Sequence, residues 1–267
     1  MTFSDIDPPF IENMRNQAEI GREVYFFEST DSTNLCAERA FVDGAKHGSV
    51  FIANSQSLGR GRFGRSWLST PDAGIYLSIL LRPALAKEDC PKISLLPGLA
   101  AVLAINEVCG VQAKLKWPND VLLNGKKICG VLSEFFCPDP DDSYGIIVGI
   151  GINVHHNQGH FDRAGLADVA TSLDIETGVP QNRNILISAF LEEMETLLAL
   201  LVTEKFEQVL KLWKSHCEMF GKDITLSQGT TTYKGKALGL DNQGNLLLET
   251  GENKTMSFSS GETTLKK

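Results

Sequence analysis

The chain has 267 residues, of which 42% are hydrophobic and 22% are charged, and its formal net charge is −8. This length and composition are ordinary for a globular protein with one large domain, or with one large and one small domain. The acidic balance disfavours a general affinity for nucleic acid, because phosphate contacts need a basic surface. No apolar run looks long enough to span a membrane, and the N-terminus lacks the pattern of a signal peptide.

The first half of the chain predicts strands that alternate with helices. Residues 1 to about 20 indicate an extension or a first helix. Strands are expected at 24–27, 49–53 and 74–81, the last of which is buried to judge from its continuous apolar content. A helix at 34–42 has Ser32, Thr33 or Asn34 as its cap, and an alanine-rich buried helix is expected at 95–108.

The second half of the chain begins with three predicted strands and ends in a series of short ones. Strands are expected at 115–117, 121–123 and 127–136, with a type I′ hairpin turn at Asn124-Gly125. A buried strand at 146–153 and helices at 184–203 and 206–217 follow. Past Phe220, short strands at 223–226, 231–240, 245–249, 255–258 and 263–265 predict a small barrel or sandwich. We therefore expect two domains, 1–220 and 221–267.

The six cysteines are scattered, without a C-x-x-C pair, at Cys36, Cys90, Cys109, Cys129, Cys137 and Cys217. This spacing indicates reduced thiols and a cytoplasmic location, not a disulfide framework or a zinc site. His155, His156 and His160 lie in a polar loop with no matching carboxylate cluster in the sequence, so metal ligation is disfavoured there.

The most informative motif is the sequence GRGRFGRSW at residues 59–67, which we call the Gly/Arg loop. Glycine lets a backbone approach a ligand closely, and arginine donates in pairs to phosphate or carboxylate. The terminal Trp67 offers a flat apolar face to a base. These three properties together favour a nucleotide site, whereas the motif alone is also compatible with a solvated loop or a nucleic-acid contact.

The same loop matches the G-x-G-x-x-G pattern through Gly59, Gly61 and Gly64. A dinucleotide-binding fold needs a helix that opens inside this pattern, and residues 66–72 read as a loop. Arginines also fill positions where that fold packs closely. We therefore reject the dinucleotide-binding interpretation.

Four other motifs join the Gly/Arg loop along the chain: STDSTN at 29–34, KWPND at 116–120, KKICGVLSE at 126–134 and VGIGINV at 148–154. In order and spacing, these motifs resemble those of the biotin protein ligases, and the small β domain with its GNLLLE and SGE stretches resembles that family's C-terminal module. The resemblance covers about residues 24–267. It implies an α+β fold with a class II synthetase-like mixed sheet flanked by helices, plus a small SH3-like β-barrel.

The resemblance also implies an activity in two steps. Biotin and MgATP give biotinoyl-5′-AMP and pyrophosphate, and a lysine of a biotin carrier protein domain then attacks the acyl-adenylate. Lys127, Arg62 and Asp120 are the implied catalytic residues. Lys127 suits the biotin carboxyl group and the developing acyl-phosphate, and Lys126 is expected to point to solvent because strand residues alternate. Whether Asp120 binds magnesium or helps deprotonate the acceptor lysine stays open, and no certain metal ligand is assigned.

Two overlapping sets of residues are implied for the ligands. The biotin set is Ser32, Thr33, Asn34, Gln56, Arg60, Gly61, Arg62, Lys127, Gly130 and Gly149. The ATP set is Arg60, Arg62, Arg65, Trp67, Lys116, Asn119 and Asn153. Gly130 and either Gly149 or Gly151 are expected to leave room for the rings and chain of biotin, with Trp67 as the adenine platform and Asn153 as a partner to the base. Trp117 before Pro118 is expected to pack in the core.

Several alternatives remain beside this interpretation. A lipoate or octanoate ligase or transferase shares the catalytic fold, a non-catalytic protein could keep the biotin pocket, and a nucleic-acid regulator is a third class. About twenty residues precede the first strand, too few for a helix-turn-helix domain, so we expect a monofunctional ligase that does not repress transcription. Phe63 stands where a basic residue would make the loop more cationic. Monomer and homodimer both remain open.

Overall fold

The computed structural model describes residues 6–137, 144–251 and 254–265. A seven-stranded mixed sheet forms its centre, in the order β1-β2-β3-β7-β6-β5-β4. β1 pairs with β2 in parallel, and the other neighbours are antiparallel. The strands are β1 (Val24–Phe27), β2 (Val50–Ala53), β3 (Gly74–Leu81), β4 (Lys114–Lys116), β5 (Asp120–Leu123), β6 (Lys126–Phe136) and β7 (Gly145–Asn153). The predicted α+β class is confirmed, and so are the strands predicted between residues 24 and 153.

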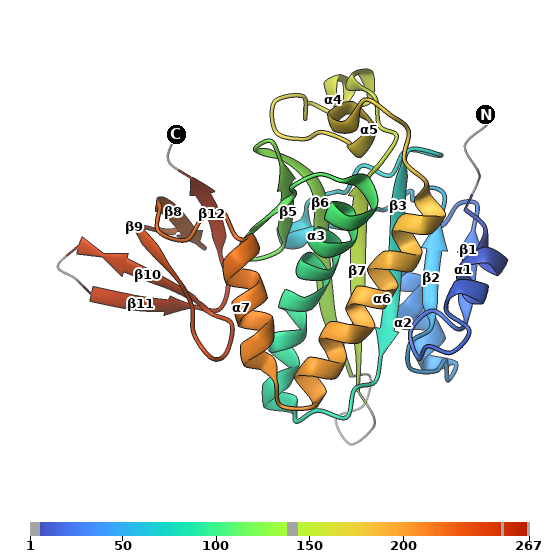
Figure 1. Ribbon diagram of the computed structural model, residues 1–267, viewed down its shortest axis with the longest axis horizontal. Helices are drawn as coiled ribbons and strands as arrows, with labels where there is room; N and C mark the ends of the chain where they lie inside the picture. The colour runs from blue at the N-terminus through green and yellow to red at the C-terminus, as the bar shows by residue number, and fades with distance from the viewer. Residues whose placement is uncertain (1–5, 138–143, 252–253, 266–267) are drawn as a thin grey trace.

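The helices divide between the two faces of this sheet (Figure 1). α3 (Leu96–Cys109) and α6 (Arg183–Val202) cover one face, and α2 (Thr33–Val42) lies on the other. Alternation along β2 sorts the side chains accordingly: Val50 and Ile52 join the large core, whereas Phe51 joins a smaller cluster with α2. Because α2 is short, it covers only part of its face and leaves the rest of that face for a cavity.

A second, five-stranded antiparallel sheet follows α7 (Phe206–His216), in the order β11-β10-β9-β8-β12. Its strands are β8 (Asp223–Gln228), β9 (Thr231–Leu240), β10 (Leu246–Thr250), β11 (Lys254–Phe258) and β12 (Glu262–Leu265). The buried Thr263 hydroxyl donates to the carbonyl of Trp117 at 2.6 Å. This bond joins β12 to the turn between β4 and β5, so the second sheet borders the central one.

α1 (Pro8–Met14) is a first helix of seven residues, one of the two possibilities that the sequence indicated for the N-terminal segment. The 3-10 helix η2 (Lys87–Leu95), α4 (Gln158–Arg163) and α5 (Leu173–Thr177) were not predicted. Helices of this length are marginal alone and form through tertiary contacts, which a sequence pattern does not display. At Asn124 and Gly125 both φ angles are positive, 51° and 80°, so the predicted I′ hairpin turn is confirmed.

The stretch from η2 through α3 corrects one expectation. Lys87–Cys109 spans 23 residues, and its most apolar window of 18 residues has a mean hydropathy of 1.5, so this stretch is long and apolar enough to cross a membrane by length and composition. The expectation that no run reaches this length was therefore wrong. Within its most apolar window, 61% is buried inside the protein, and α3 packs against α6. Those contacts are the ones expected of the core helix of a globular protein.

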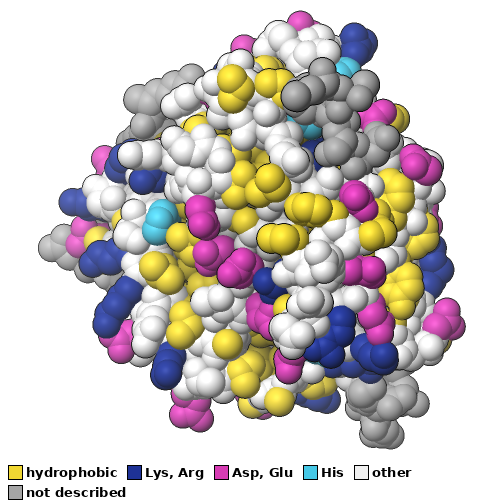
Figure 2. Space-filling view, turned by 45° about the vertical axis from the view of Figure 1, so that its right-hand side comes forward, with side chains coloured by type: hydrophobic (Ala, Val, Ile, Leu, Met, Phe, Trp, Pro, Cys, Tyr) yellow, Lys and Arg dark blue, Asp and Glu magenta, His cyan; other side chains and the backbone are white. Residues whose placement is uncertain are grey.

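None of the six cysteines, all of which lie in the described residues, forms a disulfide bond. Burial raises the pKa of Cys109 and of Cys217 to about 11, which keeps both thiols protonated at neutral pH. On the face drawn in Figure 2, acidic and basic side chains are interspersed with hydrophobic ones. That face therefore has the mixed character of an ordinary protein surface.

Candidate active site

A cavity of about 780 Å³ lies on the α2 face of the central sheet. Its wall combines the start of α2, the Gly/Arg loop, the β4–β5 turn, β6, β7, the segment 166–170 and β12. Every residue that the sequence placed in the site lies in this wall: Ser32, Thr33, Asn34, Gln56, Arg60, Gly61, Arg62, Arg65, Trp67, Lys116, Asn119, Asp120, Lys127, Gly130, Gly149 and Asn153. The fold thus brings together segments more than a hundred residues apart, while the individual roles stay predictions.

One end of the cavity is polar and is built on the first residues of α2. Ser32 is the N-cap residue, and its side chain makes no capping hydrogen bond. The amide and the hydroxyl of Thr33 lie 2.9 and 3.2 Å from Oε1 of Gln56, whose Nε2 donates to Ser69 at 2.9 Å. Buried, mutually bonded groups of this kind give a ligand a fixed set of donors and acceptors.

Three glycines on β6 and β7 belong to the floor of the cavity, and protein side chains lie close to each of them. A methyl group at Gly149 would overlap the side-chain amide of Asn34, and one at Gly151 would overlap the indole of Trp67. A methyl group at Gly130 would meet Trp67 and Lys127. Glycine at these positions therefore lets the side chains of Asn34, Trp67 and Lys127 lie close to the sheet, and the expected role of these glycines in making room for biotin stays a prediction.

The opposite end of the cavity is cationic. Nζ of Lys127 lies 2.5 Å from Oδ1 of Asp120, and Nζ of Lys116 lies 4.0 Å from Oδ2 of the same carboxylate. Arg62 donates to Oδ1 of Asn119 at 3.2 Å. Burial lowers the pKa of the Arg62 guanidinium, and the negative charges of Asp120 and Glu262 oppose that shift. Three cations around one carboxylate leave a positive excess that suits the phosphates of a nucleotide.

The Gly/Arg loop is folded back on itself and tied at two places. The amide of Gly61 donates to the carbonyl of Arg65 at 2.7 Å, which closes a tight turn around Phe63 (φ 56°). Arg60 pairs with Glu134 at 2.7 Å, and Arg65 pairs with Glu262 at 2.5 Å. The loop is thus anchored to β6 on one side and to β12 on the other, although the Phe63 side chain at its tip is 65% exposed.

The structure also shows the surroundings of Trp117, Lys126 and Asn153, for which specific expectations arose from the sequence. Trp117 is 2% exposed and packs in the large core, as predicted. Lys126 lies outside the cavity wall, but its Nζ donates to the carbonyl of Ala167 at 2.9 Å and is not simply solvated. Asn153 is buried, and its Nδ2 donates to the carbonyl of Thr171 at 3.0 Å. Its amide nitrogen is therefore engaged by the protein in this structure.

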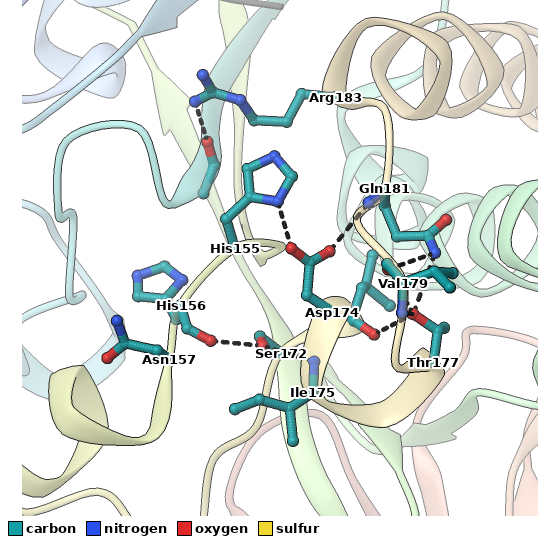
Figure 3. A network of polar contacts seen from close by, with 12 residues as sticks. His155, His156, Asn157, Ser172, Asp174, Ile175, Thr177, Val179, Gln181 and Arg183 are labelled. Carbon is teal, nitrogen blue, oxygen red and sulfur yellow. Dashed lines mark hydrogen bonds and ion pairs between the residues drawn. The ribbon is translucent and has the colours of Figure 1, made fainter. Parts of the chain in front are cut away.

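Figure 3 shows the polar network that supports the wall beside Lys127. Nδ1 of His155 lies 2.6 Å from Oδ2 of Asp174. The other oxygen of this carboxylate, Oδ1, accepts a hydrogen bond from the backbone amide of Gln181 at 3.0 Å. The hydroxyl of Ser172 donates to the carbonyl of His156 at 2.6 Å. These bonds hold α5 and the residues just before it against the segment that follows β7.

That segment in turn holds the backbone of Lys127. The amide of Lys127 donates to the carbonyl of Val169 at 2.8 Å, and its carbonyl accepts from the amide of Thr171 at 3.0 Å. The backbone of the lysine is therefore fixed on both sides, while its side chain, 31% exposed, reaches into the cavity.

His156 gives a testable dependence of stability on pH. It is 1% exposed, and burial, together with the positive charges of His160 and His155, lowers its pKa to about 4 from an ordinary 6.5. Between these values the unfolded chain binds a proton that the folded protein does not, so stability falls as the pH drops from 6.5 to 4, by about 3 kcal/mol at most.

Urea unfolding of the protein and of His156→Asn at several pH values measures this. The loss between pH 6.5 and pH 4 is expected to be smaller in the variant. Parallel profiles for the two proteins contradict the assignment of this dependence to His156.

The sequence analysis missed several residues of the site. Glu134 and Glu262 hold the loop arginines, and Ser78 supports the polar end of the cavity through Thr33 and Asn34. Glu134 lies inside the motif at 126–134, and Ser78 is a lone serine in the otherwise apolar run at 74–81. A buried hydroxyl in such a run signals an internal hydrogen-bond partner. No sequence pattern predicts that residues 166–170 line the cavity, because their position depends on tertiary contacts.

Comparison with known proteins agrees with this geometry. A model of the biotin/lipoate A/B protein ligase family matches residues 26–153, and a model of the biotin protein ligase C-terminal domain matches residues 219–264. The bifunctional ligase/repressor BirA of Bacillus subtilis is 35% identical over 233 residues, which cover 87% of this chain and 71% of that protein.

Two further relatives are covered almost completely by this chain. The biotin–[acetyl-CoA-carboxylase] ligase of Paracoccus denitrificans is 32% identical over 82% of this chain and 91% of its own length. Among solved structures, the biotin protein ligase from Aquifex aeolicus in complex with biotin and ATP has a TM-score of 0.79 and 30% identity. That match covers 92% of this chain and 99% of the solved one.

Proposed function

This chain belongs to the biotin/lipoate A/B protein ligase family, and we propose that it activates biotin with ATP and transfers it to a carrier protein. The observation that supports this most is one cavity whose wall combines polar groups at the start of α2, the indole of Trp67 over glycines of β6 and β7, and the cations around Asp120. A ligand with a polar ring, an aliphatic chain and a carboxylate next to a nucleotide matches that combination.

The first step joins two anions. A carboxylate oxygen of biotin forms a bond to the α-phosphorus of ATP, and the bond to the β-phosphate oxygen breaks, which releases pyrophosphate. Lys127 and Arg62 supply positive charge where the carboxylate and the phosphates meet. Lys116 adds a third cation from β4, across Asp120.

The second step moves the acyl group. The unprotonated amine of an acceptor lysine attacks the carbonyl carbon of biotinoyl-5′-AMP, an amide forms, and AMP leaves with the electron pair of the broken acyl–phosphate bond. The acceptor is a lysine of a biotin carboxyl carrier protein domain. Asp120 is the carboxylate nearest to Lys127 in the cavity, and it is the candidate to receive the proton of the amine.

Magnesium would enter on the nucleotide. In residues 6–137, 144–251 and 254–265, no group of three or more His, Cys, Asp or Glu side chains could hold a metal ion. The Asp120 carboxylate is paired with Lys127 at 2.5 Å. The described residues therefore hold no ready-made site of three such ligands, and a magnesium ion would be held mainly by the phosphate oxygens of the nucleotide.

The deciding experiment measures pyrophosphate release from ATP with biotin and, in parallel, with lipoate. We expect release with biotin alone, followed by labelling of a carrier-domain lysine when that domain is added. Release with lipoate alone would assign the protein to the sister activity. Binding of biotin without any pyrophosphate release would leave a binding protein.

The same proposal includes a cytoplasmic location and no role in DNA binding. The net charge of −8 supports the second point. A DNA titration at low salt is expected to stay flat, because electrostatic binding is strongest under those conditions.

A further inference from the structure

Two exposed apolar side chains belong to the wall of the cavity. Phe63, at the tip of the Gly/Arg loop, is 65% exposed, and Val169, in the segment 166–170, is 59% exposed. No other exposed large hydrophobic side chain among the described residues lines the cavity. Residues that both line a cavity and face solvent mark the place where it opens. Phe63 and Val169 therefore lie at its mouth.

Both side chains adjoin the cationic end of the cavity. The guanidinium carbon of Arg62 lies 4.9 Å from the centroid of the neighbouring Phe63 ring. The carbonyl of Val169 accepts from the backbone amide of Lys127 at 2.8 Å. Arg62 and Lys127 are the cations that the proposed function assigns to the reacting carboxylate. The apolar part of the mouth is thus next to the place where biotinoyl-5′-AMP would be attacked.

The conformation of Phe63 makes its exposed ring informative. Its φ of 56° and ψ of 35° are left-handed, a region that bulky residues rarely adopt and that Gly and Asn adopt more readily. Most of the ring stays in contact with water, so its burial contributes little to the stability of the free protein. A ring in this position gains apolar contact only when another molecule covers it, as aromatic anchors of interfaces do.

The second step of the proposed reaction brings such a molecule to the mouth. The acceptor amine is carried at the end of a lysine stem of four carbon atoms. Because this stem is short, the surface around the lysine must approach the mouth before the amine can reach an acyl carbon inside the cavity. Biotin and the nucleotide occupy the interior, which leaves the exposed side chains of the mouth to the carrier domain.

We propose that Phe63 and Val169 anchor the carrier domain over the mouth of the cavity, by packing against apolar groups around its acceptor lysine. They act on the transfer step and not on the formation of biotinoyl-5′-AMP. This role also accounts for an apolar residue at position 63, where a basic one would make the loop more cationic. The inference rests on the proposed function for the identity of the partner.

The test compares the KM for the isolated biotin carrier domain of an acetyl-CoA carboxylase between the protein and its variants. Phe63→Asn removes the ring and leaves a residue that tolerates the left-handed conformation, and it is expected to raise this KM about tenfold. Val169→Ser is expected to raise it about threefold, because a smaller apolar group is lost. Phe63→Tyr keeps the ring and is expected to keep the KM within about twofold of the parental value.

Two measurements without the carrier separate docking from catalysis in the cavity. Pyrophosphate release in the first turnover is expected to stay within about threefold in Phe63→Asn, because an exposed contact between a guanidinium and an aromatic ring is weak. Discharge of bound biotinoyl-5′-AMP by hydroxylamine, a nucleophile too small to need a docking surface, is expected to stay within the same range. Leu58→Ser and Val179→Ser are the matched controls, since both side chains are exposed, at 62% and 56%, and lie outside the cavity wall.

A parental KM for the carrier domain in Phe63→Asn and in Val169→Ser overturns the inference, and if one variant fails to fold, the other decides. A rise of the KM in the control variants as large as that in Phe63→Asn overturns it as well. So does an equal loss of hydroxylamine discharge, since the side chains then act on the adenylate itself. If the unmodified protein releases no pyrophosphate with biotin in the absence of the carrier, the proposed function is wrong and the inference fails with it.

Discussion

Replacing Lys127 by alanine is expected to slow formation of biotinoyl-5′-AMP by about a hundredfold to a thousandfold. Its ammonium group lies in the cavity beside Asp120, where it can offset charge as the carboxylate of biotin approaches the α-phosphate. The variant leaves Asp120 with the more distant Lys116, 4.0 Å away, which adds repulsion toward both anions. Biotin-dependent pyrophosphate release measures the rate.

The neighbouring lysine provides the matched control. Lys126 carries the same charge on the same strand, but its Nζ lies outside the cavity and donates to the carbonyl of Ala167. Lys126→Ala is expected to keep the rate within about threefold, because its ammonium group bonds to the carbonyl of Ala167 and does not line the cavity. A parental rate for Lys127→Ala, or equal losses in both variants, contradicts the role given to Lys127.

Replacing Gly149 by alanine is the second substitution with a large expected effect. The added methyl group would overlap the side-chain amide of Asn34, which is held by Ser78 at 2.5 Å and by Glu134 at 2.8 Å. Asn34 must leave this position, and its buried partners lose their hydrogen bonds. We expect biotin binding to weaken at least tenfold and the free energy of unfolding to fall by about 1–3 kcal/mol.

Gly159→Ala is the control for this substitution. Gly159 lies in α4, and the atoms nearest to an added methyl group are 3.4 and 3.5 Å away, which is ordinary contact. Alanine is the better helix former by about 0.5 kcal/mol, so stability is expected to stay equal or to rise. Calorimetric titration with biotin and urea unfolding measure both variants. Normal biotin binding by Gly149→Ala contradicts the tight packing of Asn34 on this floor.

The predictions that held depend on strong local signals. The run at 74–81 became β3 because a stretch that is apolar apart from one serine needs burial on both faces, and residues 124–125 became a hairpin turn because both adopt positive φ. The Gly/Arg loop opens no α-helix, as its sequence indicated. Lys126 was expected to point to solvent, but its Nζ bonds to the carbonyl of Ala167. Alternation along a strand predicts the face to which a side chain points, but it does not predict which group the side chain meets there.

The sequence by itself determined the elements, the family resemblance and the residues of the candidate site, since periodicity, turn chemistry and motif spacing are local properties of the chain. Only the tertiary structure decided what surrounds those residues. It placed Asn34 over Gly149 and Trp67 over Gly151, paired Arg60 with Glu134, and buried Lys87–Cys109 inside the fold. The three side-chain contacts join residues 74 to 115 positions apart, and the burial of Lys87–Cys109 depends on how helices pack on a sheet. Such pairings become favourable only when the whole chain has folded, because the burial that fixes them is shared among all the elements.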